Sequence, residues 1–96
     1  MVDMEFAPDI EELVDVEEDL GQEDVKSLIV HNDDFNTFDH VINTLIKVCK
    51  HDVHQAEQCT YIIHFKGKCA VKKGSLKELR PMRDGITDAG ISATIE

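Results

Sequence analysis

The sequence predicts a small α+β domain in which one layer of three strands carries three helices on a single face. Two observations predict it. Short β-branched or alternating runs occur three times, and the segments between them repeat apolar residues every three or four positions. In chain order the elements read β-α-α-β-α-β. Because three short strands form only one layer, the helices have to pack on one of its faces. The 96 residues allow one such domain and not two.

Charge divides the chain into two parts. Positions 1–24 hold 11 of the 20 Asp and Glu residues and no Lys or Arg, whereas positions 25–96 hold the other 9 acidic and all 10 basic residues. Like charges oppose independent folding of such a segment. We therefore predict an acidic N-terminal extension over residues 1–24 and a core domain over residues 25–96. The extension is either a solubilising leader or an arm that another protein grips, and composition leaves both open.

Composition also narrows the classes of partner. A net charge of −10 argues against nucleic acid, whose phosphates require clustered Lys and Arg. No apolar run approaches the ~20 residues that span a bilayer, so we expect no membrane partner. The N-terminus lacks a charged and then apolar leader, and the three cysteines are an odd number. These features predict a cytoplasmic protein with reduced thiols.

The first half of the core domain is expected to contain a strand, a loop and a helix. Residues 25–31 (VKSLIVH) form a β-branched run typical of a strand. The polar residues at 32–34 break it, because short polar side chains compete for local backbone groups. Apolar residues then recur at steps of three and four from Phe38 to Cys49. This spacing predicts a helix with one buried face and with Asn36 as its N-cap.

A second helix should follow at once. Asp52 is its expected N-cap, with Gln55 three residues later as in a capping box, and Gly67 supplies a left-handed stop. Residues 68–73 (KCAVKK) then predict the second strand.

The third helix has the clearest start signal. Ser75 and Glu78 form a capping box, and Gly90 marks the end of the helix. Pro81 falls inside this helix, which predicts a kink or a late start. The last six residues, ISATIE, alternate apolar and polar side chains and predict the third strand.

The residues that could carry chemistry do not favour an enzyme. The chain has no Gly-rich phosphate loop. Cys49 and Cys59 lie on the predicted apolar helix faces and Cys69 lies in a strand, which predicts buried, inert thiols. A zinc site at Cys49, His51 and His54 is an alternative, but their spacing matches no ordinary structural site and no second pair of ligands follows. We expect no catalytic activity, no cofactor and no metal.

The polar loop after the first strand is the most informative cluster. Asn32, Asp33 and Asp34 come directly after the strand, and His64 falls in the last turn of the second helix. Amide and carboxylate oxygens at a strand end can converge as acceptors, and an ammonium group has donors to satisfy. A plain turn and a helix-dipole partner explain the same residues, so the pattern alone leaves both interpretations open.

These residues resemble a known family. The run SLIVHNDDFNTFDHVINTLIKV, then Ala56 and IIHFKGKCAV, resembles the ClpS family, whose members are adaptors of the AAA+ unfoldases of the Clp protease. The resemblance extends from about Lys26 to Ala70 and returns at ISATIE. It rests on a hydrophobic strand, an Asn-Asp-Asp-aromatic loop, and a second helix ending in V/I-H-x-x-G-K. It implies three antiparallel strands with three helices on one face, the architecture shared by the C-terminal domain of the ribosomal stalk protein.

The resemblance also implies a function. ClpS proteins bind N-degrons, which are free N-termini that begin with a large hydrophobic residue, and deliver them to the N-terminal domain of a ClpA- or ClpC-type unfoldase. The positions that match the residues holding the α-amino group, or lie beside them, are Asn32, Asp33, Asp34 and His64. Those that match the rim and walls of the side-chain pocket are Asn36, Phe38, Val41, Thr60, Ile63 and Ile91. Plausible contacts to the unfoldase, in a segment that matches the family poorly, are Lys77, Glu78 and Arg80.

Two pocket positions depart from the family pattern. Phe38 stands where the family commonly has a Met thought to act against β-branched first residues, and Thr60 replaces a second Met. We expect Phe38 to narrow one side of the pocket and Thr60 to open another.

An alternative function is a protein-interaction domain of the same fold without an amine site, like the stalk domain. Fold alone does not choose between the two. The polar loop together with His64 favours the adaptor, because a stalk domain has no need of acceptors for an amine.

Overall fold

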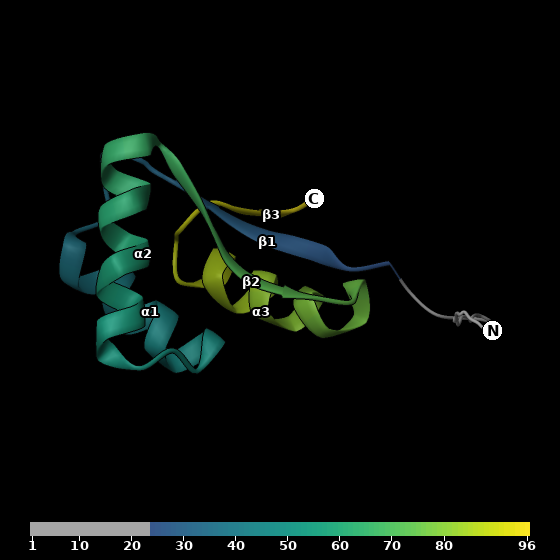
Figure 1. Ribbon diagram of the computed structural model, residues 1–96. Helices are drawn as coiled ribbons and strands as arrows, with labels where there is room; N and C mark the ends of the chain where they lie inside the picture. Colours follow the sequence, from purple (N-terminus) through teal and green to yellow (C-terminus); the bar gives the residue numbers. More distant parts are fainter. Residues whose placement is uncertain (1–23) are drawn as a thin grey trace, which may run out of the picture.

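The computed structural model describes residues 24–96, so almost all of the predicted acidic extension lies outside the described residues. The elements, shown in Figure 1, are β1 (Lys26–His31), α1 (Phe38–Cys49), α2 (Val53–Lys66), β2 (Lys68–Gly74), α3 (Leu76–Asp88) and β3 (Ala93–Ile95). This is the element order that the sequence predicts.

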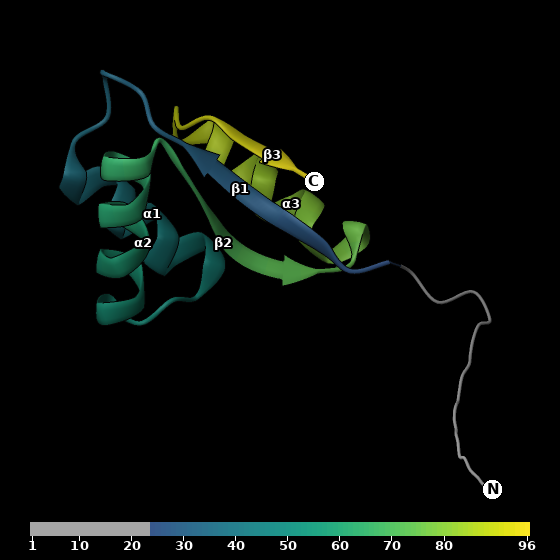
Figure 2. The same cartoon turned by 45° about the horizontal axis from the view of Figure 1, so that its top comes forward.

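The three strands form one antiparallel sheet with β1 in the centre. The strand order is β2-β1-β3, and β1 pairs antiparallel with both neighbours. Figures 1 and 2 show the three helices on the same side of this sheet. The predicted fold class is confirmed, including the antiparallel arrangement that the family resemblance implies.

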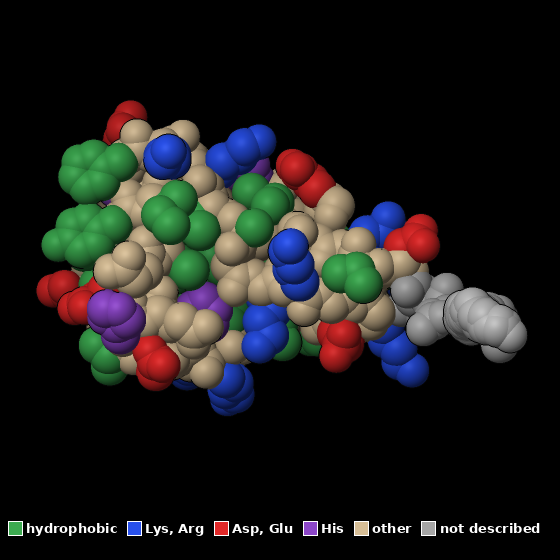
Figure 3. All heavy atoms as spheres, in the orientation of Figure 1, with side chains coloured by type: hydrophobic (Ala, Val, Ile, Leu, Met, Phe, Trp, Pro, Cys, Tyr) green, Lys and Arg blue, Asp and Glu red, His purple; other side chains and the backbone are tan. Residues whose placement is uncertain are grey.

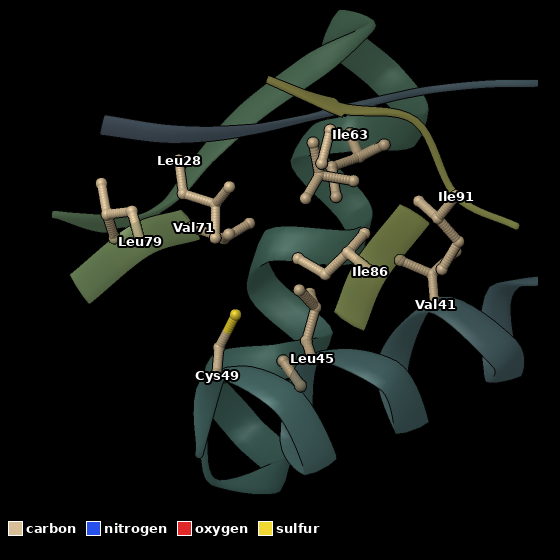
Figure 4. Close-up of a cluster of buried hydrophobic side chains, with 12 residues drawn as sticks. Leu28, Val41, Leu45, Cys49, Ile63, Val71, Leu79, Ile86 and Ile91 are labelled. Carbon is tan, nitrogen blue, oxygen red and sulfur yellow. The ribbon is translucent and has the colours of Figure 1, made fainter. Parts of the chain in front are cut away.

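The core lies between the sheet and the helices. Leu28 and Val30 of β1 are fully buried there, and Leu45 of α1 belongs to the same cluster. Figure 4 shows Leu28 and Leu45 with other members of this cluster. The other two helices contribute Ile63 and Ile86 to the same cluster. Burying such side chains is worth roughly 1.5–3 kcal/mol each, which makes this single cluster the main source of stability.

The cap of α1 differs from the prediction. Thr37, not Asn36, is the N-cap, and its Oγ1 accepts a hydrogen bond from the backbone N of His40 at 3.1 Å. Asn36 is instead held by groups outside the helix, because its Nδ2 donates to Asp33 Oδ2 at 2.7 Å and to the Gly90 carbonyl at 2.9 Å. The prediction of Asn36 as the cap was wrong, because its side-chain amide is engaged by Asp33 and Gly90 instead.

The ends of α2 follow the predicted Asp52 cap and Gly67 stop, although the Gln55 side chain makes no return bond of a capping box. Asp52 caps α2 by accepting from the backbone N of Gln55 at 2.7 Å, and Gly67 ends that helix with a φ of 93°. Only a residue without a Cβ adopts that angle at no steric cost.

The start of α3 is set by its capping box. Glu78 N donates to Ser75 Oγ at 3.2 Å, and Ser75 N donates to Glu78 Oε1 at 2.9 Å. The helix therefore begins at Leu76 and runs through Pro81. Of the two alternatives expected at Pro81, a kink or a late start, the late start does not occur, because the reciprocal cap stabilises the first turn.

The C-terminal strand confirms the alternating pattern. Gly90, with a φ of 85°, turns the chain back after α3. Ile91 and Ala93 are then buried, whereas Ser92 and Thr94 are exposed. The strand thereby covers the second edge of β1.

Candidate functional site

A small cavity lies where the loop after β1 meets the start of α1 and the C-terminal half of α2. Its volume is about 30 Å³. The residues that line it are Asn32, Asn36, Thr37, Phe38, Val41, Thr60, Ile63 and His64. All of them except Thr37 belong to the two sets of site residues that the family resemblance implies. Thr37 was missed, although a hydroxyl just before an apolar run signals a helix start.

A backbone contact brings the two predicted amine acceptors of this cavity together. The backbone N of Asn32 donates to the carbonyl of Gly67 at 2.9 Å, which ties the loop after β1 to the end of α2. His64 lies one turn before that end, in the last turn of α2. Both side chains are exposed at the rim, so an amide oxygen and an imidazole nitrogen are available to a ligand from solvent.

Asp33 organises the loop itself. Its Oδ1 accepts from the backbone N of Phe35 at 2.9 Å and of Asn36 at 2.8 Å, and its Oδ2 accepts from the Asn36 side chain. These hydrogen bonds, led by the one from the Asn36 backbone, lower the pKa of the Asp33 carboxyl below its usual value. Asp33 does not line the cavity, and its carboxylate oxygens already accept hydrogen bonds from other residues of the loop.

Two further predicted residues also lie outside the cavity lining. Asp34 is exposed beside Asp33 in the loop. Ile91 is 2% exposed and belongs to the core cluster. The cavity therefore gathers most of the predicted set, whereas Asp34 is an exposed residue of the adjoining loop.

The floor of the cavity is apolar and rigid. Val41 and Ile63 are buried members of the core cluster. Thr60 is also buried, and its Oγ1 donates to the Ala56 carbonyl at 2.7 Å, so its hydroxyl is already satisfied within the helix. A buried hydroxyl without a partner would be costly, and the bond leaves this wall suited to an apolar ligand group.

Phe38 forms the less anchored wall. Its side chain is half-buried, and its ring meets Tyr61 edge-on, with centroids 4.8 Å apart at 65°. The His64 ring lies 6.3 Å from Phe38 at 79°. Phe38 therefore lines the cavity and also contacts Tyr61 on the exposed side of α2.

Two larger hollows of the surface contain none of the residues predicted for the amine site or the side-chain pocket. One, of about 380 Å³, lies between the edge of β2 and the α1–α2 junction, and His51 lines it. The other, of about 410 Å³, lies between α1 and α3 beside Val48 and Gly85.

The zinc alternative finds no support in the geometry of residues 24–96. His51 is buried and its Nε2 bonds the Val71 carbonyl at 2.8 Å, whereas Cys49 is buried and His54 is exposed. In this part of the chain no group of three or more His, Cys, Asp or Glu side chains is placed to hold a metal ion.

The thiols are poorly suited to nucleophilic chemistry. Burial raises the pKa of Cys49 and of Cys59, and it raises that of Cys69 to about 12. A thiol must lose its proton to act as a nucleophile. Cys49 is buried as predicted, whereas the other two are half-buried.

Comparisons with known proteins agree with this geometry. Residues 22–93 match the family model described as ATP-dependent Clp protease adaptor protein ClpS. The chain belongs to the ClpS family. A ClpS adapter protein from Erwinia tasmaniensis is 32% identical over 74 residues, which cover 73% of this chain and 70% of that protein. The family is one of Clp protease adaptors, and this chain is therefore such an adaptor.

A solved ClpS structure shares the fold. Agrobacterium tumefaciens ClpS2, determined bound to L-phenylalaninamide, superposes with a TM-score of 0.75 at 17% sequence identity. The match covers 78% of this chain and 98% of that one. Within residues 24–96, no helix has the length and apolar character needed to cross a membrane.

Proposed function

We propose that this adaptor binds N-degrons, which are free N-termini with a large hydrophobic first residue, and delivers them to the N-terminal domain of a Clp AAA+ unfoldase. It acts in the cytoplasm and catalyses no reaction itself. Family membership supports the adaptor role. The observation that carries the degron part is the cavity in which Asn32 and His64 meet an apolar floor.

Three exposed acceptors suit a free α-amino group. Asn32 and His64 stand at the cavity rim, and Asp34 lies in the same loop. An ammonium group has three donors, and charged hydrogen bonds of this kind are about twice as strong as neutral ones. The related ClpS2 structure holds phenylalaninamide, which joins a free amine and a phenyl side chain on one residue, and this ligand supports the same pairing here.

The first side chain would enter beside Phe38. At about 30 Å³ the cavity is far smaller than the ~150 Å³ of an apolar cavity that binds benzene. Leu or Phe therefore enters only if a wall moves, and Phe38 is the wall that the core does not fix. Burying such a side chain is worth roughly 1.5–3 kcal/mol, enough to drive that rearrangement.

Acetylation of the peptide is the direct test of the amine site. It removes the charge and two donors and leaves the acceptors unpaired, at a cost of about 1–3 kcal/mol. We expect free Leu-, Phe-, Tyr- and Trp-initiated peptides to bind and their acetylated forms to lose about tenfold to a hundredfold in affinity. Fluorescence anisotropy measures both, with an Ile-initiated peptide added to test the narrowing effect of Phe38. Equal affinity for free and acetylated peptides would instead favour an interaction domain of the stalk type.

We assign the unfoldase contacts to the start of α3. Lys77 and Arg80 are exposed there and free of the capping box that engages the Glu78 carboxylate. Glu78 is exposed beside them, and its Oε1 accepts from the Ser75 backbone N at the same helix end, so all three charged residues belong to the proposed contact.

The acidic extension has a separate role in delivery. We expect deletion of residues 1–24 to leave peptide affinity unchanged and to abolish degradation of a Leu-initiated fluorescent reporter by the unfoldase and its protease. An adaptor acts by raising the local concentration of substrate, and an arm gripped by the unfoldase converts that proximity into transfer. A variant with the extension in scrambled order separates sequence from charge. Delivery that survives the deletion would reduce the extension to a leader.

A further inference from the structure

A continuous run of aromatic rings leads out of the cavity. We call Phe38, Tyr61 and Phe65 the aromatic run. Phe38 lines the cavity and contacts Tyr61, and Tyr61 stacks on Phe65 with centroids 6.1 Å apart and planes 4° from parallel. His64 lies alongside the run, 6.3 Å from Phe38 and 5.2 Å from Phe65.

The outer part of the aromatic run faces solvent. Tyr61 is 50% and Phe65 is 75% exposed. Figure 3 shows large hydrophobic side chains gathered at the upper left, over the C-terminal half of α2. An aromatic pair four residues apart adds only a few tenths of a kcal/mol to a helix. Contiguous exposed apolar surface more often marks a place where another chain binds.

We propose that the exposed pair of the aromatic run, Tyr61 and Phe65, is a second subsite, which reads a large apolar side chain at position 2 or 3 of the same N-degron. This inference rests on the proposed function, because it takes the amine at His64 and the first side chain in the cavity as its starting point. The ring of His64 is 5.2 Å from that of Phe65. Consecutive Cα atoms are about 3.8 Å apart, so the side chain of residue 2 or 3 of the peptide is close enough to reach these rings.

The chemistry of the run favours aromatic side chains. Aromatic rings pair edge-on or offset at centroid distances of about 4.5–7 Å, the range already spanned within the run. A ring from the substrate adds to the stacked pair of Tyr61 and Phe65. Such a pair is expected to improve affinity about three- to tenfold.

A peptide panel on the full chain tests the subsite. Wild type, Phe65→Ala and Tyr61→Ala are compared with free peptides that begin Leu-Ala-Ala, Leu-Phe-Ala and Leu-Ala-Phe. We expect wild type to prefer one of the two Phe peptides about three- to tenfold. Phe65→Ala should erase that preference while leaving the affinity for Leu-Ala-Ala within about twofold. Tyr61→Ala should erase it as well, and Phe65→Ala is the cleaner variant because it does not touch Phe38.

The control is Val53→Ala. Val53 is an exposed apolar residue at the other end of the same helix, eight residues before Tyr61 and so about 12 Å away along the axis. The Val53→Ala variant should retain the wild-type preference for one of the two Phe peptides. Equal affinity of wild type for all three peptides overturns the subsite and leaves the proposed function standing. Absence of binding to any free peptide overturns both. A dimer that Phe65→Ala dissociates, with unchanged peptide preference, would make the run an interface between copies and also overturn the subsite.

Discussion

The double substitution Asn32→Ala, His64→Ala is expected to weaken binding of a free Leu-initiated peptide about 100-fold or more. Each residue supplies one acceptor to a charged amine, and a hydrogen bond to a charged group is worth about 1.5–3 kcal/mol. Since about 1.4 kcal/mol corresponds to tenfold in affinity, the two losses together reach that magnitude. Both side chains are exposed, so the free energy of unfolding should change by less than about 1 kcal/mol.

Fluorescence anisotropy and urea unfolding together check this expectation. The matched control is His54→Ala, which removes an exposed imidazole from the first turn of the same helix, far from the cavity. It should bind peptide as wild type does. If the double variant binds the peptide with wild-type affinity, the amine does not bind at Asn32 and His64, whatever the stability of the variant.

The elements of this fold are largely encoded in local patterns. The apolar spacing from Phe38 to Cys49 and the alternation of ISATIE depend on neighbours along the chain, and both appear where the sequence predicts them. The capping box at Ser75 is equally local. It also explains why Pro81 does not delay the start of α3, because both reciprocal bonds join residues that precede Pro81 in the chain.

Long-range contacts account for what the sequence did not predict. Asn36 and Thr37 are both good N-caps by residue type. The Asn36 side chain donates to the Gly90 carbonyl, which is 54 residues away in the sequence, and Thr37 is therefore the cap. The hydrogen bond to Gly90 also holds the Asn36 amide that donates to Asp33 Oδ2. The role of Asp33 in the loop therefore could not be predicted from the sequence either.

The site, like the fold, has one part that the sequence predicted and another that depends on long-range contacts. The family resemblance placed most of the cavity residues, because the motif preserves their spacing in the chain. The volume of the cavity and the aromatic run were out of reach, since both depend on how the Phe38 ring of α1 meets α2. Tyr61 and Phe65 by themselves look like ordinary surface residues four positions apart.

Truncation of the core gives the largest expected loss of stability. Leu45→Ala should lower the free energy of unfolding by about 2–5 kcal/mol, because it removes buried methyl groups and leaves a void among fixed neighbours. Leu45 is 1% exposed and lies within the cluster that joins β1 to the helices. Single domains have only about 5–15 kcal/mol in total, so a domain this small approaches the point of unfolding.

Urea unfolding followed by circular dichroism measures the loss, with Ile62→Ala as the control because its side chain is 40% exposed on α2. The control should stay within about 0.5 kcal/mol of wild type. Leu45 does not line the cavity, so any loss of peptide binding in Leu45→Ala should follow the unfolded fraction and recover when the folded state is restored by a stabilising osmolyte. The Asn32→Ala, His64→Ala variant should not recover, because it is folded and lacks the acceptors. A Leu45→Ala domain that unfolds at the wild-type urea concentration would show that the core in Figure 4 does not hold the sheet and helices together.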